Sequence, residues 1–206
     1  MGRLGGMTSR PFHHGNLRAV LLEHAEAMLR DGGVDGLSLR ELARQAGVSH
    51  GAPRSHFIDR QALLDALAEQ GFIRFTDKIT RAVNAGGTFA ERFRRVGRAY
   101  VGFAVEDSVL MELMFAAKMN HPAGPVRDAA ARLFQVLDEA MGSPAEAPAD
   151  DGARNRFKLL FAATMQGTAT LIAAGRISGR QGEPIIDDAT DALLASELAE
   201  MVLPAR

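Results

Sequence analysis

The sequence predicts an all-α fold of about nine helices. Apolar residues recur three and four positions apart in nearly every segment, which is the spacing of one face of a helix. Glycine, proline and aspartate separate these segments, and no segment alternates apolar and polar residues as a half-buried strand does. The chain has 206 residues with 47% hydrophobic content, which suits one mid-sized domain or a small domain joined to a larger one.

The first predicted helix runs from Asn16 to about Arg30, after an arm that spans residues 1–11 and is expected to be flexible. Asn16 is a good N-cap, and the run Asp31-Gly32-Gly33 ends the helix. The residues expected to face inward are Leu17, Val20, Leu21, Ala25 and Met28.

The next predicted helix begins at Ser38 and ends at Gly47. Ser38 and Glu41 fit an S-x-x-E capping box, which satisfies N–H groups that the first turn of a helix leaves unpaired. Glycine at position 47 allows the positive φ that commonly ends a helix. The expected inward face consists of Leu39, Leu42, Ala43 and Ala46.

A second short helix is predicted from Ser49, as its N-cap, to about Phe57. Val48 would fill the turn, and the small side chain of Ala43 would let the two helices approach closely. Pro53 would fall near the first turn of this helix, where it costs at most one early hydrogen bond. Two helices joined in this way form a helix-turn-helix, whose second helix reads the DNA major groove. The alternative is an ordinary helical corner.

Six further helices are expected after this pair. Asp59 and Ser108 are candidate N-caps, and Thr88 with Glu91 forms another capping box. A Pro/Ala/acid linker is predicted at residues 142–153 and a Gly-rich loop at residues 175–184. The expected helices span residues 59–85, 88–103, 108–120, 125–141, 154–174 and 187–203. The predicted division is residues 1–60 for the arm and helix-turn-helix, and residues 61–206 for the remainder.

Composition excludes several classes of protein. With 24 basic and 25 acidic residues the chain does not coat nucleic acid indiscriminately, although residues 1–60 carry net +2 and residues 61–206 net −3. The absence of cysteine excludes disulfides and thiolate chemistry. No signal-peptide core and no run of about 20 apolar residues is visible, so we expect a cytoplasmic protein without a membrane partner.

Neither a metal site nor a cofactor is predicted. His13 and His14 are adjacent on the arm, without the i, i+4 spacing of a helical site and without a nearby cysteine or carboxylate. DNA contact or packing of the arm is the preferred interpretation of this pair. The sequence also lacks a paired nucleophile and base, a phosphate-binding loop and an HExxH motif, so an enzyme is not expected.

Several local motifs together resemble the tetracycline-repressor (TetR) family of bacterial transcription regulators. Residues 12–18, Phe-His-His-Gly-Asn-Leu-Arg, are similar to a subgroup whose arm reads Tyr-His-His-Gly-Asn-Leu-Arg. Further similarities are Gly47-Val48-Ser49-His50, Ala52-Pro53, His56-Phe57, Ala62-Leu63-Leu64, Tyr100, Phe103-Ala104 and Met114-Phe115. The resemblance covers nearly the whole chain, and it implies a three-helix DNA-binding domain joined to a helical ligand-binding and dimerisation domain.

The chain also departs from the family pattern. Arg54 stands where the family usually has tyrosine, and Ser55 where it often has an aromatic or basic residue. The subgroup's C-terminal Trp…His-Gly signature is reduced to Gly167, with Gln166 in place of the histidine and Ala162 in place of the tryptophan.

The resemblance implies a set of DNA-contacting residues: Ser38, Arg40, Ser49, His50, Gly51, Ala52, Arg54, His56 and Arg60. Ser38 is either a phosphate contact or only a helix cap. His50 could donate to guanine, and the Ala52 methyl group could contact thymine. Arg54 would bind phosphate or, alternatively, guanine, and Arg60 would act as a phosphate clamp in place of the usual lysine.

The resemblance also implies a ligand pocket and a dimer. The candidate pocket residues are Phe103, Met111, Met114, Phe115, Phe134, Phe161 and Met165, although such residues are more often core than pocket. Arg98, Glu106 and Lys118 could offer polar contacts, but the sequence does not place them. The helices at 154–174 and 187–203 would form the dimer interface, with Ala163, Gly167 and Ala169 permitting close approach. Their apolar residues are Leu159, Leu160, Leu171, Ile172, Leu193, Leu194, Leu198 and Val202.

These expectations together describe a ligand-responsive transcriptional regulator, in this family most often a repressor, that binds a palindromic operator as a homodimer and responds to a small-molecule effector. One alternative is a dimeric ligand-binding module that has lost DNA binding. The other, less favoured, is a small helical enzyme.

Overall fold

The structure, a computed structural model, describes residues 17–120, 123–142 and 151–204. Within these residues the chain forms nine α-helices and one 3₁₀-helix, without a strand, and so confirms the all-α class. Its contacts divide the chain into two compact units, residues 1–63 and 64–206. The described residues include no helix that is long and apolar enough to span a membrane.

The first unit contains α1 (Leu17–Gly32), α2 (Leu39–Gln45), the 3₁₀-helix η1 (Pro53–Ser55) and the start of α3 (Arg60–Asn84). Helix α2 packs against both α1 and η1. Their buried apolar side chains are Leu21, Leu22, Ala25, Met28, Leu29, Leu37, Leu42, Ala43, Ala46 and Phe57. The predicted inward positions of α1 and α2 are therefore buried, except that Leu17, Val20 and Leu39 are only half buried.

The second unit begins within α3 and continues through α4 (Phe89–Glu106), α5 (Ser108–Asn120) and α6 (Pro125–Met141). The predicted apolar face of α3 is buried, and Phe75 on that face stacks on Phe103 of α4 with ring centroids 4.8 Å apart. Thr88 and Glu91 form the predicted capping box of α4. At the start of α3, Asp59 Oδ1 accepts from the Ala62 N–H at 2.8 Å, which confirms its predicted capping role.

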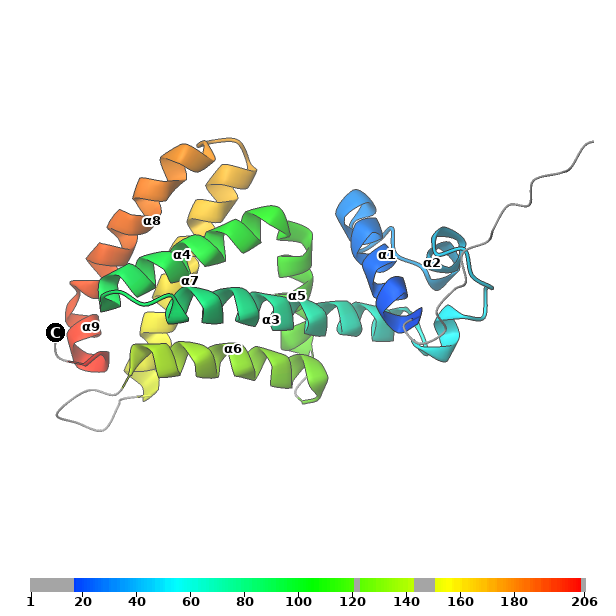
Figure 1. Cartoon of the computed structure of the whole chain (residues 1–206), viewed down its shortest axis with the longest axis horizontal. Coiled ribbons are helices and arrows are strands. Elements are labelled where there is room, and N and C mark those ends of the chain that lie inside the picture. Colours follow the sequence, from blue (N-terminus) through cyan, green and yellow to red (C-terminus); the bar gives the residue numbers. More distant parts are fainter. Residues whose placement is uncertain (1–16, 121–122, 143–150, 205–206) are drawn as a thin grey trace, which may run out of the picture. The chain divides into compact units, whose positions relative to one another are not determined.

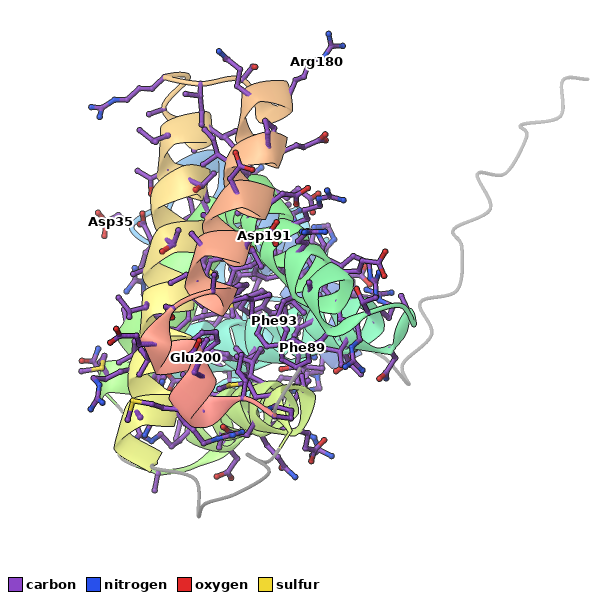
Figure 2. All side chains as sticks on the ribbon, turned by 90° about the vertical axis from the view of Figure 1, so that its left-hand side faces the viewer. Asp35, Phe89, Phe93, Arg180, Asp191 and Glu200 are labelled. Carbon is purple, nitrogen blue, oxygen red and sulfur yellow. The ribbon has the colours of Figure 1, made fainter. Side chains whose placement is uncertain are left out.

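Three helices complete this unit: α7 (Asp151–Ala173), α8 (Gly179–Leu194) and α9 (Glu197–Val202). Helix α4 packs against both α7 and α8 (Figure 1). The close approach depends on Gly97, where a Cβ atom would lie 2.9 Å from Ile186 Cγ2 and 3.0 Å from Met165 Sδ. On α4, Phe89 and Phe93 lie side by side, with stacked rings 4.6 Å apart (Figure 2).

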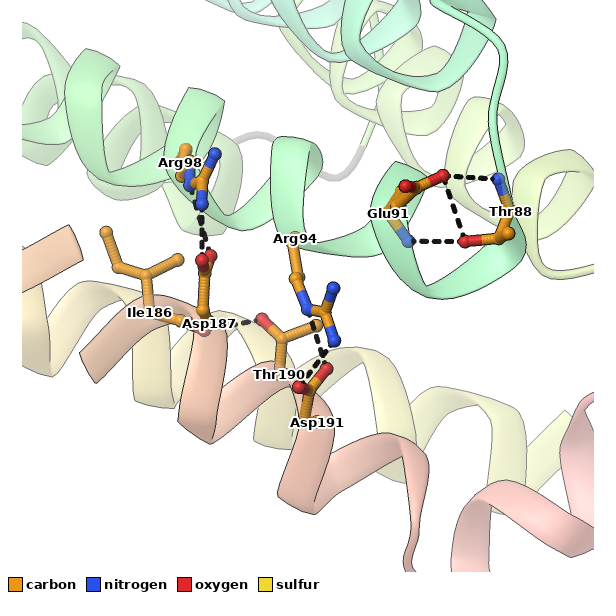
Figure 3. A network of polar contacts seen from close by, with 8 residues as sticks. All are labelled: Thr88, Glu91, Arg94, Arg98, Ile186, Asp187, Thr190 and Asp191. Atoms are coloured by element: carbon orange, nitrogen blue, oxygen red, sulfur yellow. Dashed lines mark hydrogen bonds and ion pairs between the residues drawn. The ribbon is translucent and has the colours of Figure 1, made fainter. Parts of the chain in front are cut away.

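Two ion pairs fasten α4 to α8, and we call them the arginine clasp. Arg94 Nε and Nη2 donate to the two carboxylate oxygens of Asp191 at 2.8 and 2.6 Å. One turn further along α4, Arg98 donates in the same way to Asp187 (Figure 3). The first of these pairs raises the pKa of Arg94, mainly through the hydrogen bonds to Asp191.

The second helix of the predicted helix-turn-helix is shorter than expected. Residues 49–57 were predicted to be helical, but only the 3₁₀-helix η1 forms there. Proline at position 53 has no N–H to donate to the Ser49 carbonyl, which instead accepts from Ala52 at 3.0 Å. Bonds of the i→i−3 type then continue through His56. No side chain caps η1, so the predicted N-cap role of Ser49 is wrong.

The C-terminal helices also differ from the prediction. Helix α7 begins at residue 151, within the expected linker, of which residues 143–150 lie outside the described residues. Instead of a loop at 175–184, a capping box of Ser178 and Gln181 opens α8, which continues through Pro184. The predicted final helix is broken at Ala195, and Ser196 caps the separate helix α9. Ser108 is the first residue of α5 rather than its cap.

Candidate functional site

The turn between α2 and η1 is fixed by backbone hydrogen bonds. Gly47 has a φ of 66°, as predicted for the end of this helix. The Val48 N–H donates to the Ala43 carbonyl at 3.0 Å, and the Gly47 N–H donates to the Arg44 carbonyl at 3.3 Å. This pair of bonds is a Schellman motif, which satisfies the last carbonyls of α2 and directs the chain away from its axis. The entry to η1 is therefore held in one conformation.

The predicted capping box at the start of α2 forms only in part. Ser38 Oγ accepts from the Glu41 N–H at 3.1 Å, but the Glu41 carboxylate does not return to the Ser38 N–H. It accepts instead from Arg44 Nε at 2.8 Å and from Gln45 Nε2 at 3.0 Å, one turn along the helix. These bonds, with that of Arg44 dominant, lower the pKa of Glu41 to about 2. The carboxylate is therefore ionised at neutral pH.

The residues expected to contact DNA lie at the start of α2, in the turn, in η1 and at the start of α3. Eight of the nine are exposed: Ser38, Arg40, Ser49, His50, Gly51, Arg54, His56 and Arg60. Ala52 is half buried beside the buried ring of Pro53. Exposure is the condition for contact with a ligand as large as a duplex, and this group meets it.

Arg54 and Ser55, the two departures from the family pattern, lie in η1 and differ in what they can offer a ligand. Ser55 Oγ donates to the Ala52 carbonyl at 2.7 Å, so its hydroxyl is used within the turn. Arg54 is exposed and forms no ion pair or side-chain hydrogen bond with the described residues. Its five N–H donors are therefore available to an anion.

Arg60 is positioned differently from a simple phosphate clamp. Its Nε donates to the Leu37 carbonyl at 2.8 Å and its Nη2 to the Val34 carbonyl at 2.5 Å. The side chain therefore holds the loop that precedes α2. Both carbonyls lie in the loop between the first two predicted helices. Loop carbonyls cannot be assigned to an arginine from sequence alone, and this contact was not predicted.

The second unit contains a cavity of about 610 Å³ among α3, α4, α5, α6 and α7. Seven of the chain's aromatic rings line it: Phe75, Phe93, Tyr100, Phe115, Phe134, Phe157 and Phe161. Small-molecule sites are commonly concave, of this size and mainly apolar, with a few polar groups that orient the ligand. The cavity has these properties.

The predicted pocket residues divide into two groups. Met111, Phe115, Phe134 and Phe161 line the cavity. Phe103, Met114 and Met165 do not line it and are buried in the core, where Met114 packs against Gly71 and Met165 against Gly97. The expectation that some of these residues belong to the core rather than to a pocket applies to this second group.

Several residues of the cavity wall were not predicted from the sequence. Phe93, Phe157 and Tyr100 were not predicted as pocket residues, although Phe157, Phe161 and Met165 repeat every four residues on α7 and so indicate one buried face. Lys158 was not predicted because a charged residue is expected to lie on the exposed face of a helix. Of the three polar candidates, Lys118 lines the cavity, whereas Arg98 pairs with Asp187 and Glu106 with Lys78.

Tyr100 and Gln166 bring polar atoms to the cavity from α4 and α7. The Tyr100 hydroxyl donates to Gln166 Oε1 at 3.3 Å. Burial raises the pKa of Tyr100 to about 12, so the phenol is neutral at physiological pH. Gln166 is thus a neighbour of the cavity's hydroxyl group.

The outer surface of α7 and α8 retains part of the apolar surface expected at a dimer interface. Leu159 and Leu160 are 63% and 49% exposed, and Ile185 is 40% exposed. Ala163 and Gly167 are also exposed on α7. By contrast Ala169, Leu194 and Val202 are buried within the unit and cannot contact a partner.

No cluster of three or more metal-ligating side chains occurs in the described part of the chain. His13 and His14, like Asn16, lie outside the described residues.

Family profiles match both parts of the chain. The profile of the bacterial regulatory proteins, tetR family, matches residues 21–67, which include the whole turn between α2 and η1. The profile described as tetracyclin repressor-like, C-terminal domain, matches residues 93–196, from α4 to α8.

Two curated relatives match a part of the chain. The tetracycline repressor protein class A of Escherichia coli is 40% identical over 86 residues, and the class C protein of the same organism is 44% identical over 52 residues. The matched regions cover 39% and 25% of this chain, and 40% and 24% of these relatives. The chain therefore spans less than half the length of the curated relatives it matches.

Solved structures extend the similarity to nearly the full chain. A protein of unknown function from Rhodococcus sp. RHA1 is 40% identical, with a TM-score of 0.77 and coverage of 90% of this chain and 97% of that one. A TetR family transcription regulator from Marinobacter aquaeolei VT8 is 18% identical, with a TM-score of 0.63 over 85% of this chain and 94% of that one, and shares the fold. Members of this family are regulators rather than enzymes, as the sequence led us to expect. The two profiles lead to one conclusion: the chain belongs to the TetR family of bacterial regulatory proteins.

Proposed function

We propose that this chain is a ligand-responsive repressor that binds a palindromic operator as a homodimer in the cytoplasm. In this proposal residues 1–60 read DNA, and residues 61–206 bind the effector and form the dimer. The observation that carries the proposal is the exposed group of basic side chains around a turn of fixed conformation, formed by Arg40, His50, Arg54 and His56. We also propose that the chain belongs to the subgroup with the Tyr-His-His-Gly-Asn-Leu-Arg arm, which the similarity of residues 12–18 supports.

The short η1 restricts how DNA would be read. With only residues 46–59 between α2 and α3, few side chains can reach base edges, and the small residues Gly51 and Ala52 would let the turn lie close to them. Arg54 has the most donors in this segment and is our candidate for the strongest contact. Ser38 would act as a cap and also meet phosphate, whereas Arg60 would reach phosphate only with the donors that its loop contacts leave over.

The dimer would form through the exposed faces of α7 and α8, where Leu159, Leu160 and Ile185 lie. A homodimer with two-fold symmetry presents two identical reading elements, which explains why a palindromic operator is expected. Sedimentation velocity measures this directly, and a chain that stays monomeric at micromolar concentration would contradict the dimer.

An effector bound in the aromatic cavity would control DNA affinity. Helix α3 begins at Arg60, beside the reading turn in sequence, and contributes Phe75 and Ile79 to the cavity wall. A ligand can change DNA affinity only if it binds the DNA-competent and DNA-free conformations with different affinity. The ligand would therefore change DNA affinity through the conformation of the second unit, in which α3 forms one wall of the cavity.

The test begins with genomic fragments selected by the immobilised protein. On the palindromic site so identified, Arg54→Ala should weaken binding by roughly 5- to 150-fold, the range of a good bidentate contact. Arg30→Ala is the matched control, because Arg30 lies on α1 and pairs with Glu26, at 52% exposure of its side chain. This control removes the same charge and should change affinity far less.

Salt titration distinguishes the two roles considered for Arg54. Loss of a phosphate contact lowers the slope of log affinity against log salt by about 1 and weakens all sequences alike. Loss of a guanine contact relaxes the preference at one base pair instead. Unchanged affinity in Arg54→Ala would refute the reading role, and failure to select any fragment would favour a dimeric ligand-binding module without DNA function.

A further inference from the structure

The cavity holds one cationic group without a counter-charge. Lys118, on α5, lines the wall with its Nζ 4.2 Å from the centroid of the Phe134 ring and 6.0 Å from that of Phe115. It forms no ion pair with any carboxylate in the described ranges. Contact with aromatic faces offsets only part of the cost of placing an ammonium group in an apolar wall.

The other lysine of the cavity is already neutralised. Lys158 Nζ donates to both carboxylate oxygens of Asp138 at 2.9 Å. The same carboxylate lies 3.4 Å from Arg154 Nε. One aspartate therefore pairs with two cations, Lys158 and Arg154, and it forms no ion pair with Lys118.

The surroundings of Lys118 add positive rather than negative charge. Arg127 on α6 donates to the backbone carbonyl of Lys118 at 3.5 Å. Burial lowers the pKa of Lys118, and the charge of Arg127 lowers it further. Glu112 is the acidic residue of the cavity wall, but it is exposed to solvent. An anion bound at Lys118 would supply the negative charge that no carboxylate of the described residues provides.

We propose that the effector of this cavity is an apolar organic carboxylate, whose head group pairs with Lys118 and whose body lies against the aromatic wall. This inference rests on the proposed function of the cavity as the effector site. A cationic ligand would add charge beside Lys118 and Arg127, and a neutral ligand would bury Lys118 further without a partner. The carboxylate avoids both costs.

The test uses two fluorescent probes that differ only in the head group, 1-pyrenebutyrate and 1-pyrenebutanol. Wild-type protein should bind the carboxylate about tenfold more tightly than the alcohol, as expected for a charge-assisted hydrogen bond. Lys118→Met keeps the apolar stem and removes the charge, so it should bind both probes equally while its affinity for the alcohol stays within about twofold of wild type. Lys118→Arg should retain the preference.

Lys78→Met is the matched control. Lys78 lies on α3, outside the cavity wall, and its Nζ pairs with Glu106 at 2.8 Å. This variant loses the same charge and should keep the wild-type preference. If Lys118→Met fails to fold, the ratio of the two probes on wild type and on Lys118→Arg still decides the question.

The possible results separate the two proposals. Equal binding of both probes by wild type, or a preference that survives in Lys118→Met, overturns the carboxylate inference while leaving the cavity as a ligand site. Absence of saturable binding for either probe overturns the effector site itself, and with it the ligand-responsive part of the proposed function.

Discussion

Replacing Arg154 by methionine should destabilise the protein by about 3 kcal/mol. Arg154 is 7% exposed and donates to three backbone carbonyls: those of Gly142 at 2.8 Å, Val202 at 3.0 Å and Asp138 at 2.9 Å. One side chain on α7 therefore holds the ends of α6 and α9. Methionine fills similar volume but donates nothing.

The magnitude follows from how water could replace each bond. The bond to Val202 is buried, and loss of such a charge-assisted bond costs about 2 kcal/mol. The bonds to Gly142 and Asp138 are partly buried, so water can take over, and each contributes about 0.5 kcal/mol. For a chain of this length the total corresponds to a fall in Tm of roughly 6–12 °C.

Urea denaturation followed by circular dichroism, at one fixed protein concentration, measures the change. Arg156→Met is the control, because Arg156 lies on the same helix and is exposed; its effect should stay within about 0.5 kcal/mol. If Arg154→Met matched Arg156→Met, the three carbonyl contacts would not be holding these helix ends, and the reasoning would be refuted.

Two further predictions concern the reading turn and the cavity. Gly47→Ala should lower the free energy of unfolding by about 1–2 kcal/mol. The φ of Gly47 is 66° and a Cβ atom there meets only open space, so the cost is conformational and not steric. Thermal unfolding measures the change, and Gly51→Ala is the neutral control because Gly51 has no positive φ. Because burial raises the pKa of Tyr100 from 10.0 to about 12, the folded state holds this proton more tightly, and its contribution to stability should be lost as pH rises through that range. With one tyrosine and no tryptophan in the chain, ultraviolet absorbance follows tyrosinate formation without interference, and ionisation near 10 in the folded protein would contradict the burial argument.

Sequence alone predicted the parts of the fold that depend on local chemistry. The Gly47 turn, the capping by Asp59 and the Thr88–Glu91 box follow from backbone rules that act over a few residues, and the structure has all three. The buried face of α3 follows from its four-residue spacing. Longer helices with clear periodicity leave little freedom to the prediction.

The two elements that were predicted wrongly, the segment of η1 and the start of α8, also have physical causes. Pro53 was expected to cost one bond at most, but in a segment of so few residues that bond decides between α and 3₁₀ geometry. In α8, Gly182 and Pro184 suggested a loop, whereas packing of Ile186 and Thr190 against α4 keeps the segment helical. Tertiary contacts outweighed local propensity there.

The candidate sites were predictable only as types of residue. An amphipathic pattern shows that Phe103 and Phe115 face inward, but only the arrangement of helices separates a core residue from a cavity wall. The pairing of Lys158 with Asp138 joins residues far apart in sequence, and the sequence likewise does not show that Lys118 lacks a carboxylate partner among the described residues. No local pattern carries that information.

The arginine clasp gives the two helices a fixed register. Arg94 pairs with Asp191 and Arg98 with Asp187, so the partners run in opposite order along antiparallel helices, each one turn apart. Sliding α8 by one turn, about 5.4 Å, would keep one of the pairs at most. Intermediate positions would keep neither, and Gly97 leaves no slack between the helices. Phe93, Val96 and Tyr100 on the same α4 line the cavity, so a ligand that displaces this wall must carry α8 with it as one body or break both pairs.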